Sequence, residues 1–92
     1  SELTGEAKEL ERKIENNLNI MENITERLKH LKQEVNPAYL IRDHQELKDK
    51  TEMLIDKLES VYTAEGIKLP SKFSGKIREY RNRLGKTIRE LK

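Results

Sequence analysis

Residues 3–35, LTGEAKELERKIENNLNIMENITERLKHLKQEV, carry the pattern that decides the fold. Apolar side chains recur along this stretch in alternating steps of three and four residues, over more than four heptads without a skip. Such spacing is typical of a coiled-coil helix with a narrow apolar seam. We therefore predict one long helix over residues 4–35, with a seam that needs partners along its whole length. The seam positions are Leu3, Ala7, Leu10, Ile14, Asn17, Met21, Ile24, Leu28, Leu31 and Val35.

Asn17 is the one polar residue in this seam, and two interpretations of it remain open. A buried Asn in an apolar seam fixes helix register and strand number at a cost in stability. Alternatively, the helix rotates slightly at this point, buries Leu18 and Met21, and leaves Asn17 in water. Both interpretations keep the stretch helical.

Two further helices are predicted after this first one. Asn36-Pro37 ends the first helix because the residue before a proline is disfavoured in the α region, whereas the proline itself fits the first turn of a new helix. We favour a reversal of the chain here over a kink. A second helix over 38–65 has an apolar stripe wide enough for two neighbours, and a third helix over 72–91 repeats the spacing. The stripe residues are Leu40, His44, Leu47, Thr51, Leu54, Leu58 and Val61 with Ile41, Ile55 and Tyr62 beside them, then Phe73, Ile77, Tyr80, Leu84, Thr87 and Leu91 with Ile88 beside them.

The whole chain, residues 1–92, is thus predicted to be a single all-α domain. Its class is an antiparallel three-helix bundle or coiled-coil segment with a long first helix. A composition of 34% hydrophobic and 39% charged residues suits that class better than a compact globule. No apolar run approaches the roughly 20 residues of a membrane span, so we expect no span and an intracellular location. Because little apolar surface is available, we expect a partner or self-association to supply part of the burial.

Catalytic and metal chemistry find little support in the residues. The chain has no cysteine, which removes disulfides, thiolate catalysis and Cys-based zinc sites. His30 and His44 lie on different predicted helices, so a partly buried structural His44 is favoured over joint metal ligation. There is no Gly-rich phosphate loop, nucleophile elbow or carboxylate pair in an apolar setting. We predict a non-enzymatic chain that needs no cofactor.

Charge is distributed unevenly along the chain. Residues 67–92 carry nine Lys or Arg against two Glu, whereas residues 1–36 and residues 37–66 are each acidic overall. The simplest explanation is that a basic third helix packs against two acidic ones. Binding to phosphate or to an acidic membrane is the alternative. Nucleic-acid binding is not expected, because no aromatic side chains interleave with the basic ones and no known motif is present.

Residues 70–80, PSKFSGKIREY, carry a motif that goes beyond composition. Written P-x-x-F-x-G-[KR]-[IL]-x-E, it resembles the segment that opens a late helix in the coiled-coil region of the channel nucleoporin 54 family, called nucleoporin 57 in yeast. Residues 31–35, LKQEV, and 39–41, YLI, with the acidic helix after them, are similar to the same family. The motif residues are Pro70, Phe73, Gly75, Ile77 and Glu79.

This resemblance implies a scaffold segment of the central transport channel of the nuclear pore, at the nuclear envelope. In that family the coiled-coil region assembles with two other channel nucleoporins, while Phe-Gly repeats in other parts of the protein bind cargo receptors. The present sequence contains no Phe-Gly dipeptide, so it would hold only the assembly function. The implied partner-contact stripe is Leu10, Ile14, Asn17, Met21, Ile24, Leu28 and Leu31.

A second resemblance is to the BAG domain, a three-helix module that binds the ATPase domain of the seventy-kilodalton heat-shock chaperone and promotes nucleotide release. Leu69-Pro70 followed by Phe73 matches a feature that precedes the basic third helix of that family. This alternative implies a cytoplasmic co-chaperone whose chaperone-binding residues are Arg81, Lys86 and Arg89. A regulatory three-helix domain of a membrane-fusion protein is a third class that the sequence leaves open.

Overall fold

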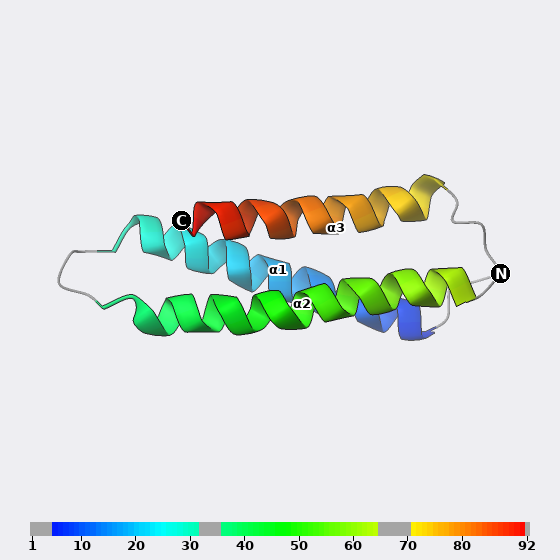
Figure 1. The fold of residues 1–92 in the computed structure, drawn as a ribbon, viewed down its shortest axis with the longest axis horizontal. Coiled ribbons are helices and arrows are strands. Elements are labelled where there is room, and N and C mark those ends of the chain that lie inside the picture. The colour runs from blue at the N-terminus through cyan, green and yellow to red at the C-terminus, as the bar shows by residue number, and fades with distance from the viewer. Residues whose placement is uncertain (1–4, 32–35, 65–70, 92) are drawn as a thin grey trace.

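Three α-helices follow one another along the chain: α1 over Gly5–Lys29, α2 over Ala38–Ala64 and α3 over Ser71–Glu90. The computed structural model describes residues 5–31, 36–64 and 71–91, with side chains from residue 75 onward in α3. The helices run alternately in opposite directions along a bundle that measures 54 × 20 × 15 Å (Figure 1). The predicted all-α, antiparallel three-helix bundle is therefore confirmed. Within the described residues, no helix combines the length and the apolar character that crossing a membrane requires.

The first helix is long, at 25 residues, but it ends before the predicted limit of residue 35. The backbone N–H of His30 bonds to the carbonyl of Arg27 at 3.1 Å in a closing turn, and Leu31 lies outside the helix. Helix α2, at 27 residues, is the longest of the three. Thr4, residues 32–35 and residue 65 lie outside the described residues.

Asn36 and Pro37 begin α2 as the sequence predicts. The side-chain oxygen of Asn36 accepts a hydrogen bond from the backbone N–H of Ala38 at 3.0 Å, as an N-cap does. The carbonyl of Pro37 accepts bonds from the N–H groups of Leu40 at 3.0 Å and Ile41 at 3.1 Å. Proline costs nothing at the first helical position, because its missing N–H would have no partner there. The chain reverses rather than kinks, and α2 returns along α1 (Figure 1).

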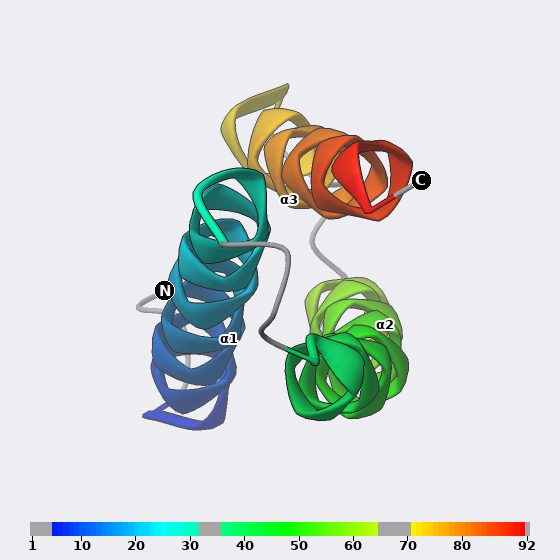
Figure 2. The same cartoon turned by 90° about the vertical axis from the view of Figure 1, so that its left-hand side faces the viewer.

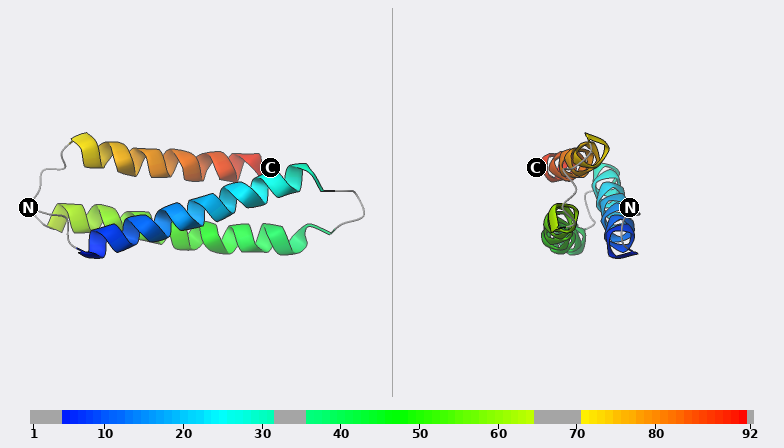
Figure 3. Two further views of the ribbon diagram at one scale, coloured as in Figure 1. Left: turned by 180° about the vertical axis from the view of Figure 1, so that it is seen from behind. Right: turned by 90° about the vertical axis from the view of Figure 1, so that its right-hand side faces the viewer.

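Side chains from all three helices meet in one core. Viewed along its length, the bundle places the helices around a common centre (Figure 2). Helix α1 crosses obliquely, from beside α2 at its start to nearer α3 at its end (Figure 3). The core cluster consists of Ala7, Leu10, Ile14, Leu18 and Met21 of α1, Ile55, Leu58 and Tyr62 of α2, and Ile77, Tyr80 and Leu84 of α3.

The two ends of the bundle differ in what they bury. We call the end with the start of α1, the end of α2 and the start of α3 the Tyr62 end, and the opposite end the His44 end. Apolar and tyrosine side chains fill the Tyr62 end. The buried polar side chains Thr25, His44 and Thr87 lie toward the His44 end, and the two threonine hydroxyls donate to the backbone carbonyls of Glu22 at 2.8 Å and Leu84 at 3.0 Å.

Candidate functional site

Most of the predicted contact stripe of α1 is buried inside the bundle. Ile14 and Met21 are fully buried, and Leu10 and Ile24 are each 5% exposed. Leu10, Ile14 and Met21 belong to the core cluster that α2 and α3 complete. A partner therefore reaches these side chains only if the three helices separate.

The remaining stripe residues lie at the edge of the core. Asn17 is half-buried, while its neighbour Leu18 is fully buried and occupies the core position. Of the two interpretations of Asn17, the structure thus favours the rotated helix, with Asn17 at the margin and not as a buried polar residue. Leu28 is half-buried near the end of α1, and Leu31 is half-buried just beyond it.

One large apolar side chain of α1, Ile20, remains exposed beside a shallow pocket. Ile20 is 43% exposed and lines a shallow pocket of about 420 Å³. Ile20, Ile24 and Leu28 follow one another at intervals of four residues, which places them on one side of the helix. We call the surface formed by the residues that line this pocket the Ile20 groove. They are Ile20, Asn23, Ile24, Glu26 and Arg27.

Tyr39 at the start of α2 extends the Ile20 groove. The guanidinium of Arg27 donates to the Tyr39 hydroxyl at 3.3 Å, and the Tyr39 side chain is itself half-exposed. This bond joins the end of α1 to the start of α2 on the outside of the bundle. The result is a surface with apolar, amide and charged groups side by side, a composition that suits a contact with another protein.

The nucleoporin-like motif is distributed over the start of α3. Ile77 is buried in the core, whereas Gly75 and Glu79 are exposed. Pro70 and the Phe73 side chain lie outside the part of the chain that the structure describes. The three described motif residues thus divide between one core contact and two surface positions.

Three basic residues of α3, Lys76, Arg81 and Arg83, form ion pairs with acidic residues of the other two helices. Arg83 donates to both carboxylate oxygens of Glu22, at 3.0 and 2.8 Å, and this contact lowers the pKa of the Glu22 carboxyl. Arg81 reaches Asp56 and Glu59 of α2, each at 3.2 Å. These pairs supply the charge complementarity that the uneven sequence predicts. The α3-to-neighbour ion pairs of the described residues are Lys76–Glu11, Arg81–Asp56, Arg81–Glu59, Arg83–Glu22 and Glu90–Lys29.

Lys86 and Arg89, the other two residues assigned to chaperone binding, remain exposed on α3. Neither forms an ion pair with any residue that the structure describes. Arg81 differs, because its guanidinium already bridges two carboxylates of α2. The three residues are therefore not equivalent as a binding surface.

Two tyrosines bring polar groups into the Tyr62 end of the bundle. The Tyr62 hydroxyl donates to Glu11 of α1, and the other oxygen of the same carboxylate accepts from Lys76 at 3.0 Å. The Tyr80 hydroxyl donates to Glu15 at 3.4 Å. Burial raises the pKa of both phenols, with the nearby glutamates adding to the shift. Both phenols therefore stay protonated and act as hydrogen-bond donors.

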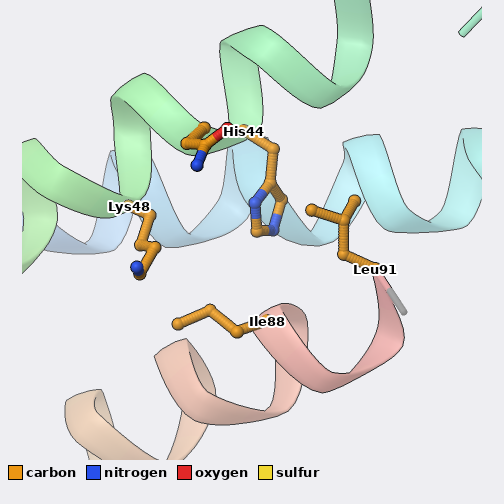
Figure 4. Close-up of a pocket in the computed structure, with 5 residues that line it drawn as sticks. His44, Lys48, Ile88 and Leu91 are labelled. Carbon is orange, nitrogen blue, oxygen red and sulfur yellow. The ribbon is translucent and has the colours of Figure 1, made fainter. Parts of the chain in front are cut away.

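A pocket of about 300 Å³ opens between α2 and α3 at the His44 end. The His44 ring points from α2 toward Ile88 and Leu91 of α3, with Lys48 one helical turn away (Figure 4). His44 is 1% exposed, and neither ring nitrogen has a hydrogen-bond partner among the described residues. Burial, with a smaller effect from the Lys48 charge, lowers the pKa of the imidazole. The sequence predicts a partly buried His44, whereas the structure buries it fully and leaves both ring nitrogens without a partner among the described residues.

The exposure of Ile20 and Tyr39 was not predicted. The sequence pattern indicates that Ile20 widens the apolar stripe beside Asn17, which is wrong, because the Ile20 side chain is 43% exposed. The available signal was a large apolar side chain off the stripe in a chain with 39% charged residues. Comparison with protein-family models, with curated proteins and with solved structures finds no match to this chain.

Proposed function

We propose that this chain is a non-enzymatic helical assembly module, a scaffold segment of a nuclear pore central-channel nucleoporin. The observation that supports it best is the exposed Ile20 side chain of the Ile20 groove, next to Tyr39. A helix in an apolar groove is a recurrent mode of recognition, with anchors spaced three and four residues apart. A coiled-coil helix of a partner would lay its apolar face along Ile20 and the exposed edge of Leu28.

The buried seam changes how the partner is expected to bind. Because Ile14 and Met21 already pack within the bundle, the partner adds to the outside of α1 and does not replace α2 or α3. Arg27 and Glu26 at the groove margin offer one charge of each sign to a partner helix. Such rim charges affect the choice of partner and the association rate more than the affinity.

Capture of a partner by the immobilised chain tests this proposal. Purified coiled-coil segments of channel nucleoporins should be retained by the native chain, and Ile20→Asp should weaken retention by about tenfold or more, as loss of an apolar anchor does. Met53→Asp is the matched control, because Met53 is 72% exposed on α2 and does not line the groove. Equal losses in the two variants, or no retention by the native chain, would contradict the proposal.

Self-association through the same groove can be distinguished from binding of a different chain. In sedimentation equilibrium at micromolar concentration, a second copy in the groove would give a dimer that Ile20→Asp converts to a monomer. A monomer at all concentrations, together with retention of nucleoporin segments, assigns the groove to a different chain.

The competing function is a BAG-type co-chaperone, which the exposure of Lys86 and Arg89 on α3 favours. On this hypothesis the chain retains the ATPase domain of the seventy-kilodalton heat-shock chaperone and releases it when ATP is added. Combined Lys86→Glu and Arg89→Glu should abolish that retention, whereas Arg78→Glu at another exposed position of α3 should not. Arg81→Glu is a poorer probe, because it also breaks the ion pairs with α2.

A further inference from the structure

The pocket between α2 and α3 combines apolar walls with two basic groups. Ile88 and Leu91 of α3 form the apolar side, and His44, Gln45 and Lys48 of α2 form the polar side. Its volume of about 300 Å³ is at the lower end of the range for small-molecule sites. An apolar pocket with a few convergent polar groups is the usual form of such a site.

His44 is the feature of this pocket that requires an explanation. Buried polar side chains in native proteins nearly always have a hydrogen-bond partner, and leaving one without costs about 1–3 kcal/mol. Thr25 and Thr87 nearby satisfy this rule through backbone carbonyls, but both nitrogens of the His44 ring are unpartnered among the described residues. A half-turn about the Cβ–Cγ bond exchanges ring nitrogens with ring carbons in the same volume. The ring can therefore present a nitrogen to the pocket without repacking the helices.

The charges around the pocket select the kind of ligand. Lys48 contributes a cation, and no carboxylate lines the pocket among the described residues, so a metal cation or an amine is disfavoured. Among the described residues, Lys48 is also the charged group that affects the pKa of the His44 imidazole. No charged group of α1 or α3 contributes to that shift. One cation and one imidazole suit a monoanion better than a phosphate dianion. The walls formed by Ile88 and Leu91 suit a short aliphatic chain.

We propose that this pocket is a binding site for a short aliphatic carboxylate. The carboxylate accepts a hydrogen bond from His44 and pairs with the ammonium of Lys48, while the aliphatic chain contacts Ile88 and Leu91. The bound anion gives a partner to the His44 ring, whose nitrogens have none among the described residues. The proposal is independent of the assembly function, which uses the outer face of α1.

Nuclear magnetic resonance of the two imidazoles tests the site with sodium hexanoate as the probe. The chain has two histidines, and the exposed His30, bonded to Glu26 at 3.1 Å, serves as an internal reference. Hexanoate should shift the His44 signals saturably and raise the His44 pKa, because an anion favours imidazolium. The His30 signals should not move. Hexanamide, which has the same chain without the charge, should produce no such shift.

Two variants separate recognition from folding. Lys48→Gln should weaken hexanoate binding by about tenfold, as loss of a charge-assisted contact does, whereas Lys50→Gln at an exposed position outside the pocket should leave it unchanged. His44→Leu should abolish binding while circular dichroism reports an intact bundle. Absence of a saturable shift in the native chain, equal shifts with hexanamide, or equal shifts at His30 would each overturn the proposal.

Discussion

At the Tyr62 end of the bundle, each described buried polar group has a partner on a neighbouring helix, whereas at the His44 end a buried imidazole has none. Glu11 of α1 accepts from Tyr62 of α2 and pairs with Lys76 of α3, so one carboxylate links all three helices. The His44 end instead has threonines that bond within their own helices, and a pocket between α2 and α3.

With the proposed groove and pocket as binding sites, cohesion and binding would fall at different ends of the same bundle. Apolar side chains and cross-helix hydrogen bonds both favour keeping the Tyr62 end closed. The His44 end buries polar groups that add little to cohesion between helices, and the pocket and the Ile20 groove both lie toward it. Regions with fewer buried apolar contacts open at lower free energy than the core does. The predictions that follow test this contrast in order of expected size.

Truncation of matched leucines on α2 should give the largest difference. Leu58 is fully buried in the core cluster, and Leu40 is 2% exposed but lies outside that cluster, toward the His44 end. Leu58→Ala should lower the free energy of unfolding by about 3–5 kcal/mol, and Leu40→Ala by about 2 kcal/mol, because the Leu58 site is enclosed by more of the structure. Urea denaturation followed by circular dichroism measures both. A larger loss at Leu40 would reverse the assignment of the two ends.

Replacing the unsatisfied imidazole should have the next largest effect. His44→Leu keeps a similar volume and removes two buried polar atoms, so we expect the free energy of unfolding at pH 7 to rise by about 1–2 kcal/mol. His30→Leu is the matched control at an exposed site, with no gain expected. A loss of stability in His44→Leu, measured by the same urea titration, would mean that the imidazole has a stabilising partner.

The same residue should make the native bundle sensitive to acid. Burial lowers the His44 pKa below its ordinary value of 6.5, so the folded state binds this proton less readily than the unfolded state does. Stability is then full above about pH 6.5 and is lost as the pH falls from there through the folded-state pKa. Urea midpoints measured between pH 7.5 and pH 5.5 should fall in the native chain, and the fall should be largely absent in His44→Leu. Parallel curves for the two proteins would rule out His44 as the cause.

The helix count, the chain reversal at Asn36-Pro37 and the antiparallel order could all be predicted from apolar spacing and proline chemistry. Which residues of each helix face the core could not be predicted in full. A strict heptad has 3.5 residues per turn, whereas a straight α-helix has 3.6, so the buried face drifts along each helix. In α1 the core passes from Ile14 to Leu18, not to Asn17, and in α2 Ile55 is buried while Leu54 is half-buried.

The candidate surfaces were less predictable than the core, because they depend on how the helices cross. Whether Ile20 is covered depends on the oblique course of α1, which no heptad pattern specifies. The orphaned His44 likewise requires knowledge of what α3 places opposite it, namely Ile88 and Leu91. By contrast, the uneven charge along the chain was sufficient to predict that a basic third helix packs against acidic neighbours, and the pair of Arg83 with Glu22 is one instance.

Glycine replacement in α3 should give a smaller, stabilising effect near the Tyr62 end. A Cβ added at Gly75 meets nothing within 4 Å, so Gly75→Ala should raise the free energy of unfolding by about 0.5–1 kcal/mol through helix propensity alone. At Gly85 the added carbon lies 3.3 Å from a guanidinium nitrogen of Arg89, which must move, so Gly85→Ala should gain less. Thermal unfolding of both variants checks the order. A greater gain at Gly85 would show that the last turns of α3, at the His44 end, limit stability.

The smallest effect is expected for the ion pair between Glu22 of α1 and Arg83 of α3. Glu22→Gln removes a two-point contact with Arg83 and should cost about 0.5 kcal/mol, because both side chains are partly exposed and the charges are screened. Arg83 lowers the Glu22 pKa, so this contribution is present above the ordinary carboxyl value and is lost as the pH falls through the folded-state pKa. Glu26→Gln, at the exposed pair with His30, should leave the urea midpoint unchanged. If Glu22→Gln costs as much as Leu40→Ala, then charge pairing and not apolar packing holds the His44 end of α3 in place.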